Sequence, residues 1–230
     1  MRTAAILPVK RFARAKQRLG ASVADALRRE LAGAMVADVL AALTRAQAIE
    51  LTIVVTSERT VADAAVHHGA IVVADAAEEG QPAAAALGVR RALEHGIERV
   101  LCVPGDCPAL DPAELDALLD AHAREEHPAG VVIVPDRHGS GTNGLLLAPP
   151  DAIPPSFGPD SCERHRALAR TAGVACRVER VPSLLLDIDT GADLDALRAR
   201  LAGHSAGAIR TRAVLGHDER SHLISIKTPA

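Results

Sequence analysis

Residues 130–147 read Gly-Val-Val-Ile-Val-Pro-Asp-Arg-His-Gly-Ser-Gly-Thr-Asn-Gly-Leu-Leu-Leu, two apolar runs on either side of a polar, glycine-rich loop. The apolar residues are continuous rather than alternating, which is typical of strands covered on both faces of a sheet. We therefore expect strands at 131–135 and 144–147. A plain hairpin needs only about two to five loop residues. Because glycines let backbone N–H groups approach a ligand, the longer Asp136–Gly144 loop is predicted to hold a phosphate or carboxylate.

The same alternation of strand and helix patterns continues along most of the chain. Further strands are expected at 3–9, 51–56, 70–74, 100–104 and 176–181. Helices are expected to begin near Ser22, at Asp111-Pro112 and at Thr190, the last of these opening the final helix. The pattern predicts an α/β fold: a single-domain, Rossmann-like, mostly parallel sheet with helices on both faces. This domain is expected to span residues 1–203, with a C-terminal tail at 204–230 that is either mobile or a short strand used in association.

Composition excludes several classes of protein. The 230 residues are 48% apolar and 24% charged, with a net charge of −3, no Trp or Tyr and two Phe. Without aromatic platforms or a basic surplus, we expect no nucleic-acid partner. No run is long enough to span a membrane and no signal peptide is recognised, so we expect no membrane partner and a cytoplasmic location. The four cysteines lack metal-ligand spacing and are expected to be incidental thiols.

Basic residues follow the first predicted strand. Lys10, Arg14, Lys16 and Arg18 lie between a strand end and a helix start, where a phosphate clamp is common. The alternative is a solvated basic loop. Neither a P-loop nor a dinucleotide-binding glycine motif is present.

Acidic residues follow two later strands. Asp106 ends an apolar run and is flanked by glycine and prolines, a rigid setting suited to a Mg²⁺ ligand. Asp187 and Asp189 alternate, so both should face one side and could join Asp106 around a cation. The alternatives are an ordinary turn for Asp106 and helix capping for Asp189 or Thr190.

A second glycine-containing segment, Phe157–Ser161, precedes another helix. Gly158 permits close backbone approach, and Ser161 at the helix N-terminus would form an anion site together with Thr142 and Asn143. The alternative is an ordinary N-cap serine. His165 could contact the substrate or face solvent. Together these clusters indicate a Mg²⁺-dependent enzyme acting on phosphate esters.

Five segments in this order resemble the guanylyltransferases of coenzyme F420 biosynthesis. They are Pro8–Leu19, Gly105–Leu110, Asp136–Asn143, Phe157–Ser161 and Asp187–Thr190, and the resemblance covers about residues 1–200. It implies a glycosyltransferase-A-like nucleotidyltransferase architecture. It also implies transfer of GMP from GTP to the phosphate of phosphoenolpyruvate or 2-phospho-L-lactate, with release of pyrophosphate. The alanine- and arginine-rich composition favours phosphoenolpyruvate, as in the bacterial members.

The resemblance also implies roles for individual residues. Thr142, Gly158 and Ser161 would bind the acid, and Asp106 and Asp189 would hold Mg²⁺ together with Asp187. Lys10, Arg14 and Lys16 would hold the GTP triphosphate. The catalytic residues would accordingly be Asp106, Lys10 and Lys16.

One segment departs from the resemblance and several alternatives stay open. Related enzymes often carry Gly-Leu-Asn where this chain has Gly80-Gln81-Pro82-Ala83, which leaves the base contacts undecided. Alternative functions are another nucleotidyltransferase of the same fold, such as a cytidylyl- or molybdopterin guanylyltransferase, and a non-catalytic nucleotide-binding subunit. A homodimer formed through the C-terminal tail is a further hypothesis.

Overall fold

The computed structural model describes residues 1–14, 19, 24–126, 128, 130–203 and 207–226. The strands are β1 (Thr3–Val9), β2 (Leu51–Thr56), β3 (Ile71–Ala74), β4 (Arg99–Cys102), β5 (Val131–Pro135), β6 (Thr142–Leu147) and β7 (Cys176–Val178). The helices are α1 (Asp25–Arg45), α2 (Arg59–His67), α3 (Gln81–Glu94), α4 (Pro112–Arg124), α5 (Ser161–Ala172), α6 (Gly191–Ala202) and α7 (Ile209–Ile226), with short 3-10 turns η1 (Phe12–Arg14) and η3 (Pro182–Leu184).

The strands form one sheet in the order β3-β2-β1-β4-β6-β5-β7. Strand β6 pairs antiparallel with both β4 and β5, whereas the other neighbouring pairs are parallel. The chain moves outward from β1 to β3 and then returns to the other side of β1 with β4. Ligands in such sheets bind where the strand order reverses, beyond the strands' carboxyl ends. The single, mostly parallel sheet confirms the predicted fold class.

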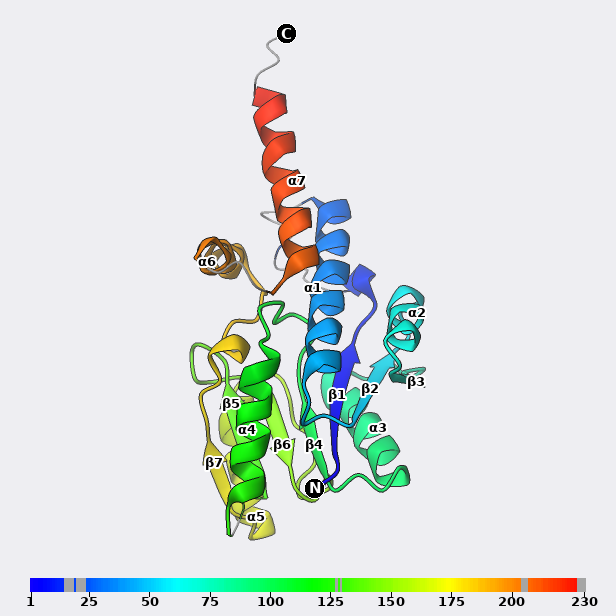
Figure 1. Ribbon diagram of the computed structural model, residues 1–230, viewed down its shortest axis with the longest axis vertical. Coiled ribbons are helices and arrows are strands. Elements are labelled where there is room, and N and C mark those ends of the chain that lie inside the picture. Colours follow the sequence, from blue (N-terminus) through cyan, green and yellow to red (C-terminus); the bar gives the residue numbers. More distant parts are fainter. Residues whose placement is uncertain (15–18, 20–23, 127, 129, 204–206, 227–230) are drawn as a thin grey trace.

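Helices cover both faces of the sheet (Figure 1). On β1, Ala5 and Leu7 pack on the face covered by α1, α2 and α4, while Ala4 and Ile6 pack on the face covered by α3 and α5. All four side chains are fully buried. Burial on both sides explains why the strand sequence is continuously apolar.

Most strand bounds match the expectations, but β4 ends at Cys102 rather than at residue 104, and two further differences are informative. Strand β6 begins at Thr142 rather than Gly144, so Thr142 and Asn143 belong to the sheet and are only 7% and 5% exposed. A register shift between Val134 and Pro135 pairs Thr142 with Pro135 and leaves Asn143 as the extra residue at the irregularity. Strand β7 ends at Val178, earlier than expected. The expected helix start at Ser22 lies outside the described residues, and α1 is described from Asp25 onward.

The helix at Thr190 is not the last one. Helix α7 follows it, begins against α1 and extends away from the body of the molecule (Figure 1). Asp38 of α1 accepts hydrogen bonds from the first-turn N–H groups of Arg210 and Thr211, at 3.0 and 2.8 Å. Val214 and Leu215 join a hydrophobic cluster with α1 and α6. This part of the C-terminal segment is therefore a docked helix rather than a strand.

All four cysteines are free, as expected, and Cys102, Cys107 and Cys162 are buried. Burial raises the pKa of Cys102 to about 12, which keeps it a thiol near neutral pH. Among the helices that the structure describes, none is long and apolar enough to cross a membrane.

Candidate active site

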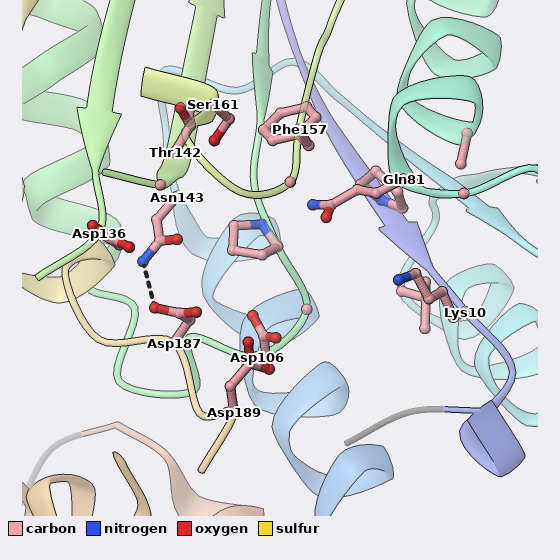
Figure 2. A pocket seen from close by; sticks show the side chains of 18 of the residues that line it. Lys10, Gln81, Asp106, Asp136, Thr142, Asn143, Phe157, Ser161, Asp187 and Asp189 are labelled. Carbon is pink, nitrogen blue, oxygen red and sulfur yellow. Dashed lines mark hydrogen bonds between the residues drawn. The ribbon is translucent and has the colours of Figure 1, made fainter. Parts of the chain in front are cut away.

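A cleft of about 1140 Å³ opens at the carboxyl ends of β1 and β4 and beside the first residues of β6. Eight residues singled out from the sequence line it: Lys10, Asp106, Thr142, Asn143, Gly158, Ser161, Asp187 and Asp189. Lys16 and Arg18 lie outside the described residues, as does the side chain of Arg14. The described members of the clusters predicted separately along the chain therefore converge on one cleft, the basic cluster being represented there by Lys10 (Figure 2).

Three carboxylates lie close together in this cleft (Figure 2). Asp106 follows β4, and its backbone carbonyl accepts a hydrogen bond from the N–H of Ile188 at 3.1 Å. This bond joins the Asp106 loop to the segment that carries Asp187 and Asp189. Burial raises the pKa of Asp187, and the negative charge of Asp106 raises it further. The cluster therefore favours an added positive charge.

Asn143 supports this cluster from β6. Its Nδ2 donates to the carbonyl of Leu184 at 2.7 Å and to Oδ1 of Asp187 at 3.1 Å, the bond dashed in Figure 2. Both amide hydrogens are thus used within the protein. This differs from the expected anion contact, because Asn143 orients a carboxylate instead.

The carboxylates of the cleft are a donor set that suits Mg²⁺. Within the described part of the chain, no three or more His, Cys, Asp or Glu side chains are grouped as a ready metal site. Mg²⁺ is usually held by one or two carboxylates, with substrate phosphates and water completing the shell. The described cleft lining carries eight carboxylates and one ammonium group, that of Lys10. Added positive charge would therefore favour the binding of anionic substrates to this described lining.

Thr142 and Ser161 lie near one another on one side of the cleft (Figure 2). The backbone N–H groups of Ser161 and Cys162, at the start of α5, donate to the carbonyls of Gly158 and Ser140 at 3.1 and 3.0 Å. Those two N–H groups are therefore not available to an anion, contrary to the expected helix-terminus site. Ser161 is the first residue of α5 rather than its N-cap, so its hydroxyl is the group it can offer to a ligand.

The Asp136–Gly141 turn, which connects β5 and β6, is held by hydrogen bonds to its own aspartate, Asp136. Asp136 accepts from the N–H of Ser140 through Oδ1 at 3.1 Å and from the N–H of Gly139 through its carbonyl at 3.1 Å. A Cβ on Gly141 would lie 2.7 Å from Asp136 Oδ2. The glycine at 141 therefore admits a carboxylate of the protein, which is not the external anion we expected at this turn.

His165 neither faces solvent nor lines the cleft. Its side chain is fully buried beneath Thr142, with Nδ1 3.1 Å from the Thr142 hydroxyl and Nε2 accepting from the N–H of Ser156 at 2.8 Å. Desolvation lowers its pKa to about 4, with a further contribution from the charge of Arg164. Both expectations for this residue were wrong.

The opposite side of the cleft carries Lys10 and Gln81, whose side chains face its interior (Figure 2). Gly80, with φ of +109°, caps α3 and turns the chain into the helix at this point. Asp75 and Glu79 also line this side, although the sequence analysis did not single them out. Asp75 directly follows β3, and this position at the carboxyl end of a strand is the sequence signal that could have indicated it as a cleft residue.

Solved structures define the class of this fold. A protein described as a nucleotide-diphospho-sugar transferase from Desulfovibrio desulfuricans G20 is similar with a TM-score of 0.74, covering 96% of each chain at 17% identity. At this identity the likeness shows the fold alone. The fold is thus that of glycosyltransferase-A-like nucleotidyltransferases.

The chain belongs to the CofC-like guanylyl transferase family, whose sequence model matches residues 3–208. It is 52% identical over 215 residues to the phosphoenolpyruvate guanylyltransferase of Conexibacter woesei, covering 94% of this chain and 96% of that protein. It is 40% identical over 205 residues to the enzyme of the same name from Sphaerobacter thermophilus, covering 89% and 95%. The resemblance stated from the sequence is confirmed, and the protein is a nucleotidyltransferase.

Proposed function

We propose that this enzyme transfers GMP from GTP to the phosphate of phosphoenolpyruvate, in coenzyme F420 biosynthesis in the cytoplasm. An oxygen of the acid's phosphate would form a bond to the α-phosphorus of GTP, and the bond from that phosphorus to the β-phosphate oxygen would break, releasing pyrophosphate. The observation that carries the proposal is a shared cleft that presents a carboxylate cluster and two hydroxyl side chains, in a chain closely related to proteins named for this activity.

The position of each residue in the cleft suggests its role in the proposed reaction. Lys10 would neutralise the triphosphate, and the hydroxyls of Thr142 and Ser161 would orient the acid. No general base is needed, because a phosphate oxygen is already an anionic nucleophile. Asp106 and Asp189, with Asp187 oriented by Asn143, would hold Mg²⁺. When bound, Mg²⁺ neutralises charge on the phosphates of both substrates.

The base contacts are proposed to come from the side of the cleft formed by Gly80 and Gln81. The Gln81 carboxamide faces the interior, and it offers both a donor and an acceptor to a nucleobase. This would replace the contacts that related enzymes make through Gly-Leu-Asn. Comparing GTP, ATP and CTP in the assay below would test the preference for guanine.

The proposal is tested by measuring pyrophosphate release with Mg²⁺ and GTP, in parallel with phosphoenolpyruvate, 2-phospho-L-lactate and no acid. A coupled transferase of the pathway would consume the unstable product. We expect release that depends on phosphoenolpyruvate. Dependence on 2-phospho-L-lactate instead would correct the substrate, and release with neither acid would refute the proposal.

A variant links the activity to the carboxylates. Asp106→Asn should abolish turnover while leaving the circular dichroism spectrum and the Tm near those of the wild type. Asp151→Asn is the matched control, because Asp151 is exposed and lies outside the cleft lining. Wild-type turnover in Asp106→Asn would remove this residue from the metal site.

A further inference from the structure

His165 is held in a single orientation beneath the cleft. Its ring is fully buried and packs edge-to-face against Phe157, with ring centroids 5.4 Å apart. The preceding residue, Arg164, donates from Nε to the Ser156 hydroxyl at 3.1 Å and from Nη2 to the Ser156 carbonyl at 3.0 Å. The start of α5 therefore anchors the loop that carries Phe157 and Gly158, and His165 forms part of that anchor.

The hydrogen bonds determine which ring nitrogen carries the proton. The partner of Nε2 is the backbone N–H of Ser156, which can only donate, so Nε2 must be unprotonated. In a neutral imidazole the hydrogen then resides on Nδ1. Burial lowers the pKa of His165 to about 4, so the ring is neutral near pH 7. Nδ1–H therefore donates to the hydroxyl oxygen of Thr142, 3.1 Å away.

This assignment fixes what Thr142 can offer to a ligand. Because its oxygen accepts from His165, its hydroxyl hydrogen cannot also point at the ring and is available to another acceptor. Thr142 lines the cleft on the side where the acid is placed by the proposed function. A hydroxyl that donated to the histidine would present only lone pairs to the ligand and would repel an anion.

We propose that His165 is a positioning residue that makes the Thr142 hydroxyl a hydrogen-bond donor toward the acid substrate. This inference rests on the proposed function for the identity of the acid. The assigned tautomer depends only on the side chains of His165 and Thr142 and on the N–H of Ser156. It assigns a role to a residue that never touches the substrate. It also explains why a histidine is buried in the first turns of α5.

The tautomer can be measured without any substrate. Two-dimensional ¹⁵N NMR of protein labelled at histidine, compared with the His165→Gln spectrum at pH 7, isolates the signals of this ring. We expect a protonated Nδ1 and a bare Nε2. A proton on Nε2 would overturn the inference whether or not the enzyme uses phosphoenolpyruvate.

Steady-state kinetics with GTP and phosphoenolpyruvate tests the effect on the acid. His165→Gln can still accept from Ser156 but loses the donor to Thr142, so the KM for the acid should rise about tenfold while the KM for GTP stays near the wild-type value. His165→Asn places an amide N–H near the Nδ1 position and should recover most of that loss.

A double-mutant cycle separates positioning from general structural damage. In a Thr142→Val background, His165→Gln should change the KM for the acid by less than twofold, since the group it acts through is gone. An undiminished tenfold effect in that background, or an unchanged KM in His165→Gln alone, would overturn the inference. If wild-type enzyme releases no pyrophosphate with phosphoenolpyruvate, the proposed function fails, and the NMR result alone decides the tautomer.

Discussion

The buried His165 should make stability depend on pH in a defined window. Its pKa falls from an ordinary 6.5 to about 4 in the folded protein, because the buried ring is desolvated. The unfolded chain therefore binds this proton more readily than the folded chain between these two values. Consequently, the free energy of unfolding should fall as the pH falls from about 6.5 toward 4. The full difference between the two pKa values corresponds to a little over about 3 kcal/mol, of which about 2 to 3 kcal/mol is lost between pH 7.5 and pH 4.5.

Urea unfolding at pH 7.5 and pH 4.5 measures this contribution. Carboxylates also titrate in this range, so the comparison is between the wild type and His165→Gln, which lacks the titrating ring but keeps the acid groups. The wild type should lose about 2 to 3 kcal/mol more than this variant over the interval. His138→Gln replaces an exposed histidine and controls for loss of an imidazole as such. Equal losses in the wild type and His165→Gln would refute the reasoning.

Three further predictions concern stability. A Cβ at Gly88 would lie 2.4 Å from Ile6 Cγ2, so Gly88→Ala should lower the free energy of unfolding by about 1 to 3 kcal/mol in urea titrations. Thr190 caps α6, and Thr190→Ala should cost about 1 kcal/mol by the same measurement, whereas an unchanged midpoint would remove the cap from consideration. Asp187→Asn should raise the Tm without divalent ions, because it relieves repulsion with Asp106, and should diminish any Tm gain from Mg²⁺; a full Mg²⁺ gain would contradict its role.

The fold could be predicted from the sequence because its strands are buried on both faces. Their apolar runs carry no competing signal, and turn and capping residues such as Asp111 and Thr190 mark the helix starts. Helix α7 was missed because most of its sequence is polar, and the apolar residues that dock it, Val214 and Leu215, pack against the distant helices α1 and α6. The hydrogen bond from the Arg210 N–H to Asp38 joins residues that are 172 positions apart, so no local sequence pattern indicates it.

The position of Asp106 in the cleft could be predicted, because polar residues that directly follow a strand lie at the end of the sheet where ligands bind. The prediction failed for residues whose polar groups hydrogen-bond to other side chains of the protein. Asn143 and His165 have polar groups that suit a ligand, but their partners are Asp187 and Thr142. Only the three-dimensional arrangement shows which hydrogen-bonding groups are already used inside the protein.

The reversed direction of β6 has a consequence for how the cleft is divided along the chain. Segments before Asp106, the end of β1 and the start of α3, contribute the side with Lys10 and Gln81, whereas β6 and the start of α5 contribute Thr142 and Ser161. Each side of the cleft thus comes from its own stretch of the chain, and the two sides meet at the carboxylates of Asp106, Asp187 and Asp189. Under the proposed function, selectivity for the acid can diverge through changes confined to one contiguous stretch, residues 136–165, while the side with Lys10 and Gln81 keeps its sequence and geometry.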